Sequence, residues 1–225
     1  MLNDKKYVLI VAGGSGARMN LTLPKQFIRI NGKPLLMHTF DAFLRYDHTC
    51  EFVLVLPGSE IDHWRKLCKE LLFEKKHKVA EGGTTRFHSV KNGLEHVLGN
   101  GVVFIHDGVR PMVSQQTIEN CYRGALEKGN ALPVIAPSES VREVINGHNR
   151  AVDRKHYFLV QTPQTFQIEV IKKAYMQEYN KEFTDDASVL EKAGGKINLV
   201  EGNRDNIKVT FPEDIKIAAS LLPGS

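Results

Sequence analysis

A glycine-rich segment follows the first apolar run of the chain and precedes two basic residues. The run from Val8 leads into Ala12-Gly13-Gly14-Ser15-Gly16, and Arg18 and Lys25 come shortly afterwards. Glycines let the backbone approach an anion closely and leave its N–H groups open to phosphate oxygens. Two fixed cations beside such a loop can stabilise the charge of a phosphoryl-transfer transition state. The segment therefore predicts a site that handles a triphosphate.

Commoner phosphate motifs fit this segment less well. A P-loop requires a Gly-Lys pair followed by Ser or Thr at a set distance from a first glycine, and the chain has no such run. A dinucleotide-binding fingerprint requires a third small residue where Met19 stands and an acidic residue where Pro57-Gly58-Ser59 stands. Glycine turns can also serve only to tighten a strand-to-helix connection. Arg18 and Lys25 favour the phosphate site over that simpler interpretation.

A carboxylate ends another apolar run, in Phe104-Ile105-His106-Asp107-Gly108-Val109-Arg110-Pro111. Asp107 suits a Mg²⁺ ion that bridges phosphate oxygens and keeps several waters, so it is the metal candidate. The alternative is that Asp107 only turns the chain before Arg110. His106 is expected to be a packed neighbour, because Mg²⁺ prefers oxygen ligands.

A third polar segment runs from Gly82 to Ser89 and opens a predicted helix. Its main-chain N–H groups, its hydroxyls and Arg86 are what recognition of a base edge and a ribose requires. The alternative is a helix cap by Thr84 or Thr85, and both roles can hold together.

The elements that must position these residues alternate between strand and helix. We expect strands near 7–12, 51–56, 77–81, 102–106 and 131–135, and helices near 34–46, 60–73, 86–98 and 115–128. Repeated strand–helix units predict an α/β fold with a mostly parallel sheet covered on both faces. Ligands of such sheets bind at the carboxyl ends of the strands, so the loops after Ala12, Ala80 and His106 should converge on one crevice.

The alternation breaks after Pro137, where the sequence predicts a hairpin. Two short strands, at 140–144 and 151–153, would flank the turn Asn146-Gly147-His148-Asn149. An isolated hairpin is marginal in water, so we expect this one to pack on a second subunit. The remaining expectations are a helix near 167–179, a helix from Thr184 to Ala193 closed by Gly194, strands at 196–201 and 206–210, and a last helix from Pro212.

Composition excludes several classes of protein. With 225 residues the chain is long enough for one large α/β domain, and 42% hydrophobic with 25% charged residues is ordinary for a globular protein. Three widely spaced cysteines fit neither a disulfide framework nor a zinc site. The net charge of +4 is spread along the chain, so we expect no nucleic-acid partner, and the cluster Lys75-Lys76-His77-Lys78 is expected to be a solvated turn.

The start of the chain, Met1-Leu2-Asn3-Asp4-Lys5-Lys6, lacks the apolar region of a signal peptide, and no apolar run reaches transmembrane length. We therefore expect no membrane partner and a cytoplasmic location.

Trp64 lies on the apolar helical stripe of Ile61, Leu67, Cys68 and Leu71 and is expected to belong to the core.

Further motifs stand in a fixed order over nearly the whole chain. They are Ala12-Gly13-Gly14-x-Gly16-x-Arg18-Met19, Pro24-Lys25-Gln26, His106 to Pro111, Val152-Asp153-Arg154, Gln161-Thr162-Pro163-Gln164, Thr184-Asp185-Asp186-Ala187, and Glu201-Gly202 followed by Asn206-Ile207-Lys208-Val209-Thr210. In this set and order the chain resembles the 2-C-methyl-D-erythritol 4-phosphate cytidylyltransferase family of the non-mevalonate isoprenoid pathway. The resemblance implies cytidylyl transfer from CTP to 2-C-methyl-D-erythritol 4-phosphate, with release of pyrophosphate.

The resemblance also implies an architecture and a set of roles. It implies a Rossmann-like three-layer nucleotidyltransferase fold, a single domain over 1–225, and a protruding β-hairpin dimerisation arm at about 137–158. Arg18 and Lys25 would stabilise the transition state, and Arg154 and Lys208 would position the sugar phosphate. The CTP site would contain Ala12, Gly13, Gly14, Ser15, Gly16, Gly83, Thr84, Arg86, Ser89, Asp107, Gly108 and Arg110. The acceptor site would contain Ser140, Arg154, Thr162, Thr184 and Lys208. The arm would be exchanged across a homodimer, so Ser140, Arg154 and Thr184 would meet the partner's Lys25.

Three positions depart from the pattern of the family. Glu139-Ser140 stands where Asp-Thr is frequent, Thr84 replaces a common acidic residue, and Phe211 replaces a common capping Thr before Pro212. The last helix would then be capped by Thr210 or be left uncapped.

Two other functions remain as alternatives. A ribitol 5-phosphate cytidylyltransferase would share the Pro-Lys-Gln and Gln-Thr-Pro-Gln motifs and differ in the acceptor pocket, where 184–188 and 206–210 look closer to the methylerythritol enzymes. A catalytically idle nucleotide-binding module could use the same fold. Retention of Arg18, Lys25, Asp107 and Lys208 argues against the idle module.

Overall fold

The central element of the protein is a mixed sheet. The computed structural model describes residues 5–14 and 23–222, and within them eight strands form this sheet. In spatial order the strands are β10 (Leu159–Val160), β7 (Asn130–Ile135), β11 (Gln164–Gln167), β6 (Gly101–Asp107), β1 (Lys5–Val11), β4 (Glu51–Leu56) and β5 (His77–Glu81), with β12 (Leu199–Glu201) paired to β7. β1 is parallel to β4 and β6, β4 to β5, and β12 to β7, whereas β10 and β11 run antiparallel to their neighbours. The predicted mostly parallel sheet is confirmed.

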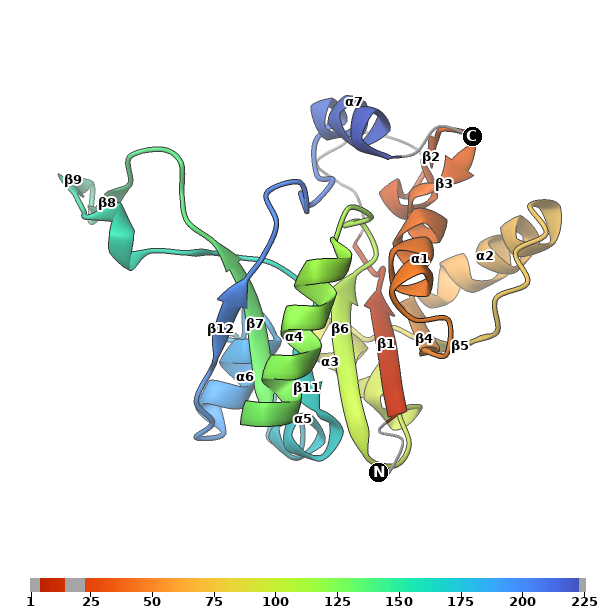
Figure 1. Ribbon diagram of the computed structural model, residues 1–225, viewed down its shortest axis with the longest axis horizontal. Coiled ribbons are helices and arrows are strands. Elements are labelled where there is room, and N and C mark those ends of the chain that lie inside the picture. The colour runs from red at the N-terminus through yellow and green to blue at the C-terminus, as the bar shows by residue number, and fades with distance from the viewer. Residues whose placement is uncertain (1–4, 15–22, 223–225) are drawn as a thin grey trace.

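Helices cover both faces of the sheet and give three layers (Figure 1). Val8 and Ile10 of β1 pack with α1 (Leu35–Tyr46), α2 (Gly58–Glu70) and α4 (Gln115–Lys128). Tyr7 and Leu9 point to the other face, toward α3 (Arg86–Glu95), α5 (Ile168–Ala174) and α6 (Asp186–Lys192). Successive residues of a strand face opposite sides, so one continuous apolar run supplies both cores.

Local signals set several helix ends. Ser114 accepts a hydrogen bond from the Thr117 N–H at the start of α4, and Gly129, at φ +86°, ends it in the left-handed region. Gly194, also at φ +86°, follows α6 as expected. α7 (Pro212–Leu221) begins at the expected Pro212, and its cap comes from Asp214, whose Oδ2 accepts the Thr210 and Phe211 N–H groups at 2.7 and 2.8 Å. Among the described residues, no helix is both long and apolar enough to cross a membrane.

A small substructure holds the segment that contains Lys25. Lys25–Phe27 forms the 3₁₀ turn η2, followed by the two-stranded pair β2 (Arg29–Ile30) and β3 (Lys33–Pro34). Phe27 is buried in the core beside Trp64, and Ile30 packs with residues of α7. Trp64 is itself fully buried and donates its indole N–H to His77 Nε2 at 2.9 Å, which confirms it as a core residue.

A hairpin arm leaves the sheet after β7 and returns at β10 (Figure 1). It consists of β8 (Arg142–Ile145), β9 (His148–Ala151) and the 3₁₀ turn η3 (Arg154–His156). The predicted hairpin is confirmed, but its expected strand and turn bounds are wrong. Asn146 and Gly147 both have positive φ, +49° and +80°. Such a two-residue turn matches the twist of the strands, so β9 begins at His148.

Other predicted bounds are also wrong. The helix expected at 167–179 spans only Ile168–Ala174, and beyond its end the Gln177 side chain donates to the Ala174 carbonyl at 2.7 Å. The strand expected at 196–201 is reduced to β12, and no strand forms at 206–210. A turn comes just before this segment, where the Asn206 N–H donates to the Asn203 carbonyl at 3.0 Å and the Ile207 N–H to the Asp205 carbonyl at 2.7 Å. Within the segment, the Val209 N–H donates to the Val109 carbonyl at 3.0 Å. A strand requires a ladder of such bonds, and the described backbone of 206–210 makes only this one to a neighbouring segment.

Candidate active site

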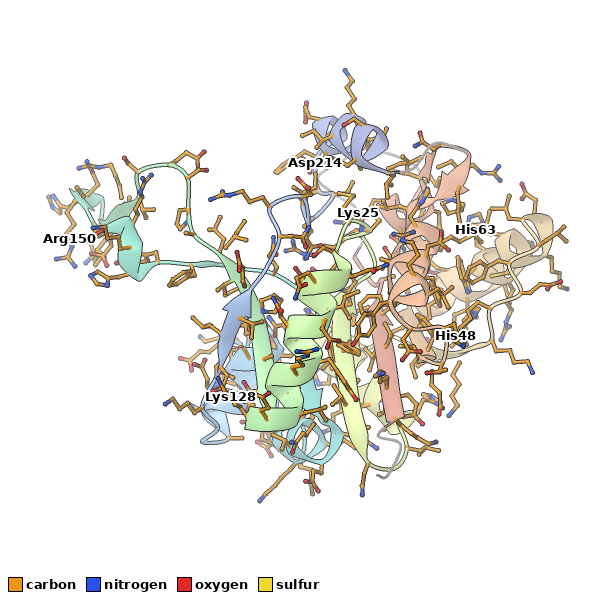
Figure 2. All side chains as sticks on the ribbon, viewed as in Figure 1. Lys25, His48, His63, Lys128, Arg150 and Asp214 are labelled. Atoms are coloured by element: carbon orange, nitrogen blue, oxygen red, sulfur yellow. The ribbon has the colours of Figure 1, made fainter. Side chains whose placement is uncertain are left out.

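A cleft of about 310 Å³ lies where β1, β5 and β6 end. Its lining combines the segments that follow these strands with two lysines from elsewhere in the chain: Val11, Ala12, Gly13, Gly14, Lys25, Gln26, Gly83, Thr84, Thr85, Arg86, Ser89, Asp107, Val109 and Lys208. Figure 2 shows Lys25 near the carboxyl ends of β1 and β6. The expected convergence of three strand-end loops on one crevice is confirmed.

The glycine segment and Lys25 form one side of the cleft. Ala12 continues β1 by donating its N–H to the Val55 carbonyl at 2.9 Å, and Gly13 and Gly14 follow it. A Cβ on Gly14 would lie 3.6 Å from Cε of Lys25, so the lysine stem runs directly beside this glycine. Lys25 is 9% exposed. Ser15, Gly16 and Arg18 lie outside the described residues.

The Gly82–Ser89 loop also lines the cleft, and Ser89 fixes its shape. The Ser89 hydroxyl donates to the Thr85 carbonyl at 2.9 Å and accepts the Gly83 N–H at 3.1 Å. A Cβ on Gly83 would come within 2.3 Å of the His88 Cβ, so this position requires glycine. Thr85, not Thr84, caps α3 by accepting the His88 N–H. Ser89 thus organises the loop, while Thr84 is exposed at its rim.

Arg86 crosses from this loop to a carboxylate on α6. Its two guanidinium nitrogens donate to Oδ1 and Oδ2 of Asp186 at 2.7 and 2.6 Å, and the Tyr175 hydroxyl donates to Oδ1 at 2.6 Å. Asp186 is fully buried. Burial alone would lower the pKa of Arg86, but the Asp186 carboxylate outweighs it and raises that pKa, so the guanidinium remains charged.

Asp107 lines the cleft at the end of β6. Its Oδ2 accepts from Lys208 Nζ at 3.0 Å and from Arg110 Nε at 3.3 Å. Burial opposes ionisation of Asp107, but Lys208, Arg86 and Arg110 outweigh it and hold the pKa of the carboxyl well below its usual range. Arg110 also donates to the Asn206 carbonyl at 2.7 Å, which fixes its side chain next to the carboxylate.

The backbone under Asp107 is held by His106 and Thr162. The Thr162 hydroxyl accepts the Asp107 N–H and pairs with His106 Nδ1, both at 3.1 Å. His106 Nε2 faces the Arg110 carbonyl at 2.9 Å, and because a carbonyl only accepts, Nε2 carries the proton and Nδ1 accepts from the Thr162 hydroxyl. Burial lowers the pKa of His106 to about 4, in keeping with this neutral ring. The expectation that His106 is a packed neighbour is confirmed.

Gly108 lets the ends of β1 and β6 approach each other. Its N–H donates to the Val11 carbonyl at 2.9 Å, and a Cβ there would lie 2.9 Å from the Ala12 Cβ. Gly108 therefore packs between the ends of β1 and β6 and does not line the cleft. Arg110 is also absent from the lining.

The residues expected to bind the acceptor are dispersed in this structure. Lys208 lies on the cleft with Asp107. Ser140 is exposed on the arm, as is Arg154, which donates to the Ser138 carbonyl. Thr162 is buried under Asp107, and Thr184 is exposed just before α6. Of the predicted acceptor residues, the described part of the chain brings Lys208 alone to the cleft lining.

The metal prediction fits the cleft. Asp107 is the one carboxylate among the described lining residues, and these residues include no group of three or more acidic, His or Cys side chains that could hold a metal by themselves. Mg²⁺ is commonly held by one or two carboxylates together with substrate phosphates. The single carboxylate therefore suits an ion that arrives with a nucleotide.

Comparison with known proteins gives the family. The family model described as IspD: 2-C-methyl-D-erythritol 4-phosphate cytidylyltransferase matches residues 7–223. The chain belongs to the IspD family.

Relatives of this IspD-family chain match over nearly their whole length. A 2-C-methyl-D-erythritol 4-phosphate cytidylyltransferase of Bacteroides fragilis is 54% identical, over 95% of this chain and 98% of its own. That of Phocaeicola vulgatus is 50% identical, over 96% and 99%. A solved 4-diphosphocytidyl-2C-methyl-D-erythritol synthase superposes with a TM-score of 0.82 at 25% identity, over 99% of this chain and all of its own, and the Francisella tularensis enzyme with 0.80 at 29%, over 97% and 100%.

The IspD motifs include residues whose roles sequence reasoning missed. Gln161 donates to the Asn203 carbonyl at 2.9 Å, and Asn206 donates to the Thr162 carbonyl at 2.8 Å. Gln164 donates to Asp185 Oδ2 at 2.8 Å and accepts the Ala187 N–H at 2.9 Å. These side chains fasten the motifs to one another. The sequence signal for these roles was that the residues belong to the motifs. Their hydrogen-bond partners lie too far along the chain to be predicted from residue spacing.

Proposed function

We propose that this protein transfers the cytidylyl group of CTP to the phosphate of 2-C-methyl-D-erythritol 4-phosphate and releases pyrophosphate. One observation carries the proposal: the cleft brings Lys25, Arg86, Asp107 and Lys208 together with the glycine segment at the carboxyl edge of the sheet. This is the arrangement that a reaction between two phosphates requires, and the family assignment supports its chemical identity.

The chemistry needs no general base. The phosphate of the acceptor is already anionic near neutral pH, so no proton has to be removed before it attacks the α-phosphorus of CTP. His106, the histidine nearest to Asp107 in the chain, is fully buried and has both ring nitrogens committed. The protein must instead hold two anions in line against their repulsion.

Cationic side chains offset this repulsion. We assign Lys25, together with Arg18 outside the described residues, to the stabilisation of charge on the α-phosphate in the transition state. Lys208, which also lines the cleft, would hold the acceptor phosphate. It now pairs with Asp107 and is still 43% exposed in its side chain, so an incoming phosphate can reach it.

Asp107 would hold the divalent cation, which we propose to be Mg²⁺. When bound, the ion neutralises charge on the triphosphate and on the pyrophosphate that leaves. Lys208 and Arg110 both contact Oδ2 and keep the carboxylate ionised, which is the form that a metal requires. The other CTP contacts would come from Gly13, Gly14, Thr84 and Arg86 in the cleft lining.

The acceptor site would be completed by a second subunit. Ser140 and Arg154 belong to an arm that projects away from the sheet (Figure 1). Its exposed apolar residues Val144, Ile145, Tyr157 and Phe158 support burial against another copy. In this homodimer Arg154 would approach the partner's Lys25. The charged substrates also fit the cytoplasmic location expected from the sequence.

Pyrophosphate release tests the reaction. The purified protein is given CTP and Mg²⁺ with either 2-C-methyl-D-erythritol 4-phosphate or ribitol 5-phosphate, and parallel samples contain EDTA. We expect Mg²⁺-dependent release with the first acceptor alone. Release with ribitol 5-phosphate alone would support cytidylyl transfer but contradict the proposed acceptor. Release with neither acceptor would favour an idle nucleotide-binding module.

Mixing two variants tests the shared site. Lys25→Ala and Arg154→Ala are each assayed at low acceptor concentration, then mixed and allowed to exchange subunits. If each site takes Lys25 from one chain and Arg154 from the other, a mixed dimer contains one intact site and activity returns. If both residues act within one chain, the mixture stays as inactive as its parts.

A further inference from the structure

Asp186 is a fully buried carboxylate that serves a residue of the cleft from outside it. It belongs to the first turn of α6, and Arg86 opens α3. The two are 100 residues apart in the chain, yet both oxygens of Asp186 accept from the Arg86 guanidinium, and Tyr175 donates a third hydrogen bond. Paired parallel hydrogen bonds of this kind fix the plane of a guanidinium as well as its position.

The residues before Asp186 are fixed for other reasons. Asp185 caps α6 by accepting the Ser188 N–H at 2.9 Å, and it accepts from Gln164 through its other oxygen. The Thr184 N–H donates to the Ser188 hydroxyl at 3.1 Å. The N–H groups of Thr184 and Asp185 and the carboxylates of Asp185 and Asp186 are thus committed to protein partners, while Thr184 itself is exposed. This is the segment expected to contact the acceptor.

Arg86 connects this segment to the nucleotide side of the cleft. It lines the cleft and its side chain is 30% exposed there, although its guanidinium is anchored on Asp186. Its charge also acts on Asp107, where it helps to keep the pKa of the carboxyl low. Charges of alternating sign therefore run from Asp186 through Arg86 and Asp107 to Lys208.

Stability alone does not account for the pair. A buried ion pair gains little over well-packed apolar residues of similar volume, because removing both charges from water is costly. Phe87 and Tyr175, stacked at 4.8 Å, already supply apolar packing in this region. What the pair provides is one orientation of a cation at the cleft wall, which an apolar pair does not provide.

We propose that Asp186 is a positioning residue that holds Arg86 in the orientation required by CTP and ties the acceptor segment 184–186 to the nucleotide loop 82–89. The proposal rests on the proposed function, because it takes CTP as the ligand of the cleft. Asp186 does not touch substrate and acts through Arg86.

The test compares two neutralised carboxylates. Asp186→Asn keeps the size of the side chain but removes the charge and one acceptor from Arg86, and we expect kcat/KM for CTP to fall about tenfold or more, mainly through KM. Asp185→Asn is the matched control, since it removes the adjacent carboxylate, keeps a good helix cap and leaves Arg86 paired. It should keep the wild-type KM for CTP. Thermal unfolding verifies that both variants fold.

A double variant gives the decisive readout. If Asp186 acts through Arg86, then Arg86→Gln with Asp186→Asn has the same CTP affinity, measured by calorimetry, as Arg86→Gln alone. Additive losses, or a wild-type KM for CTP in folded Asp186→Asn, would overturn the proposal. Failure of the wild-type protein to release pyrophosphate would instead overturn the proposed function, and the calorimetric comparison would still test the positioning role.

Discussion

The cleft wall, meaning the residues that line the cleft or hold those lining residues in place, and the hairpin arm both carry charged side chains. The two regions differ in how those side chains are held. On the wall, Arg86 and Asp107 are held by side chains and backbone from distant parts of the chain. On the arm, β8 and β9 are largely exposed, and the hydrogen bonds between their side chains and the rest of the described chain stay within the hairpin, as between Arg150 and Glu143 or Arg142 and Asn149. Figure 2 shows Arg150 at the far end of the arm.

This difference shows which part of the site one chain can organise. The wall is preorganised, so its charges need little rearrangement when a nucleotide binds. The arm has a defined local shape, but the described contacts of Arg154 do not place it against the cleft. Wall substitutions should therefore change chemistry and folding, whereas arm substitutions should change acceptor use with little effect on folding.

Lys25→Ala should give the largest effect on the wall. Lys25 lies beside the glycine segment, and loss of one transition-state donor should lower kcat about 10²-fold or more with a modest change in CTP affinity. Steady-state kinetics with calorimetric CTP binding measures both quantities. An unchanged kcat would remove Lys25 from the proposed mechanism.

Arg154→Ala tests the arm. Because Arg154 is exposed and its described hydrogen bond is to the Ser138 carbonyl, its removal should leave the melting temperature unchanged. We expect KM for the acceptor to rise about tenfold, through loss of a charge-assisted contact to phosphate. A defect confined to KM for CTP would contradict the assignment.

The pH dependence of folding stability tests His106, which supports the cleft-lining residue Asp107. Burial lowers the pKa of His106 to about 4 in the folded protein from 6.5. As pH falls through this window the unfolded chain binds the proton first, so stability present above pH 6.5 is lost at up to about 1.4 kcal/mol per pH unit from this residue. Urea unfolding at several pH values measures the slope.

Two histidine variants separate the regions. His106→Gln should flatten the slope, whereas His148→Gln, on the exposed arm, should retain it. If the slope persists in His106→Gln, another group is responsible.

Two glycines with matched geometry give the smallest and most selective test. Gly147 in the arm and Gly129 after α4 have φ of +80° and +86°, and a Cβ would meet no atom within 4 Å at either position. Alanine in this region costs about 1 kcal/mol. Gly129→Ala should lower the global free energy of unfolding by that amount, whereas Gly147→Ala should only speed amide exchange within β8 and β9. Equal global losses would mean that the arm folds as part of the core.

The amino-acid sequence by itself determined the features that depend on neighbouring residues. It predicted most strands of the sheet and most helices that cover it, the glycine after α6 at Gly194 and the start of α7 at Pro212. It also predicted the burial of Trp64 and the three strand-end loops of the cleft. These follow from apolar periodicity, capping and turn chemistry, which act over a few residues. The motif set also identified the family, because its members occur in a fixed order along the chain.

Only the tertiary structure decided how distant segments meet. It showed that Asp186 anchors Arg86, that Lys208 pairs with Asp107, and that Thr162 supports the backbone under Asp107. It also showed no strand at 206–210, where the Asn206 carbonyl accepts from Gln161 and the Asn206 side chain donates to the Thr162 carbonyl. These outcomes depend on register and on burial between segments far apart in the chain, and local spacing carries no information about either.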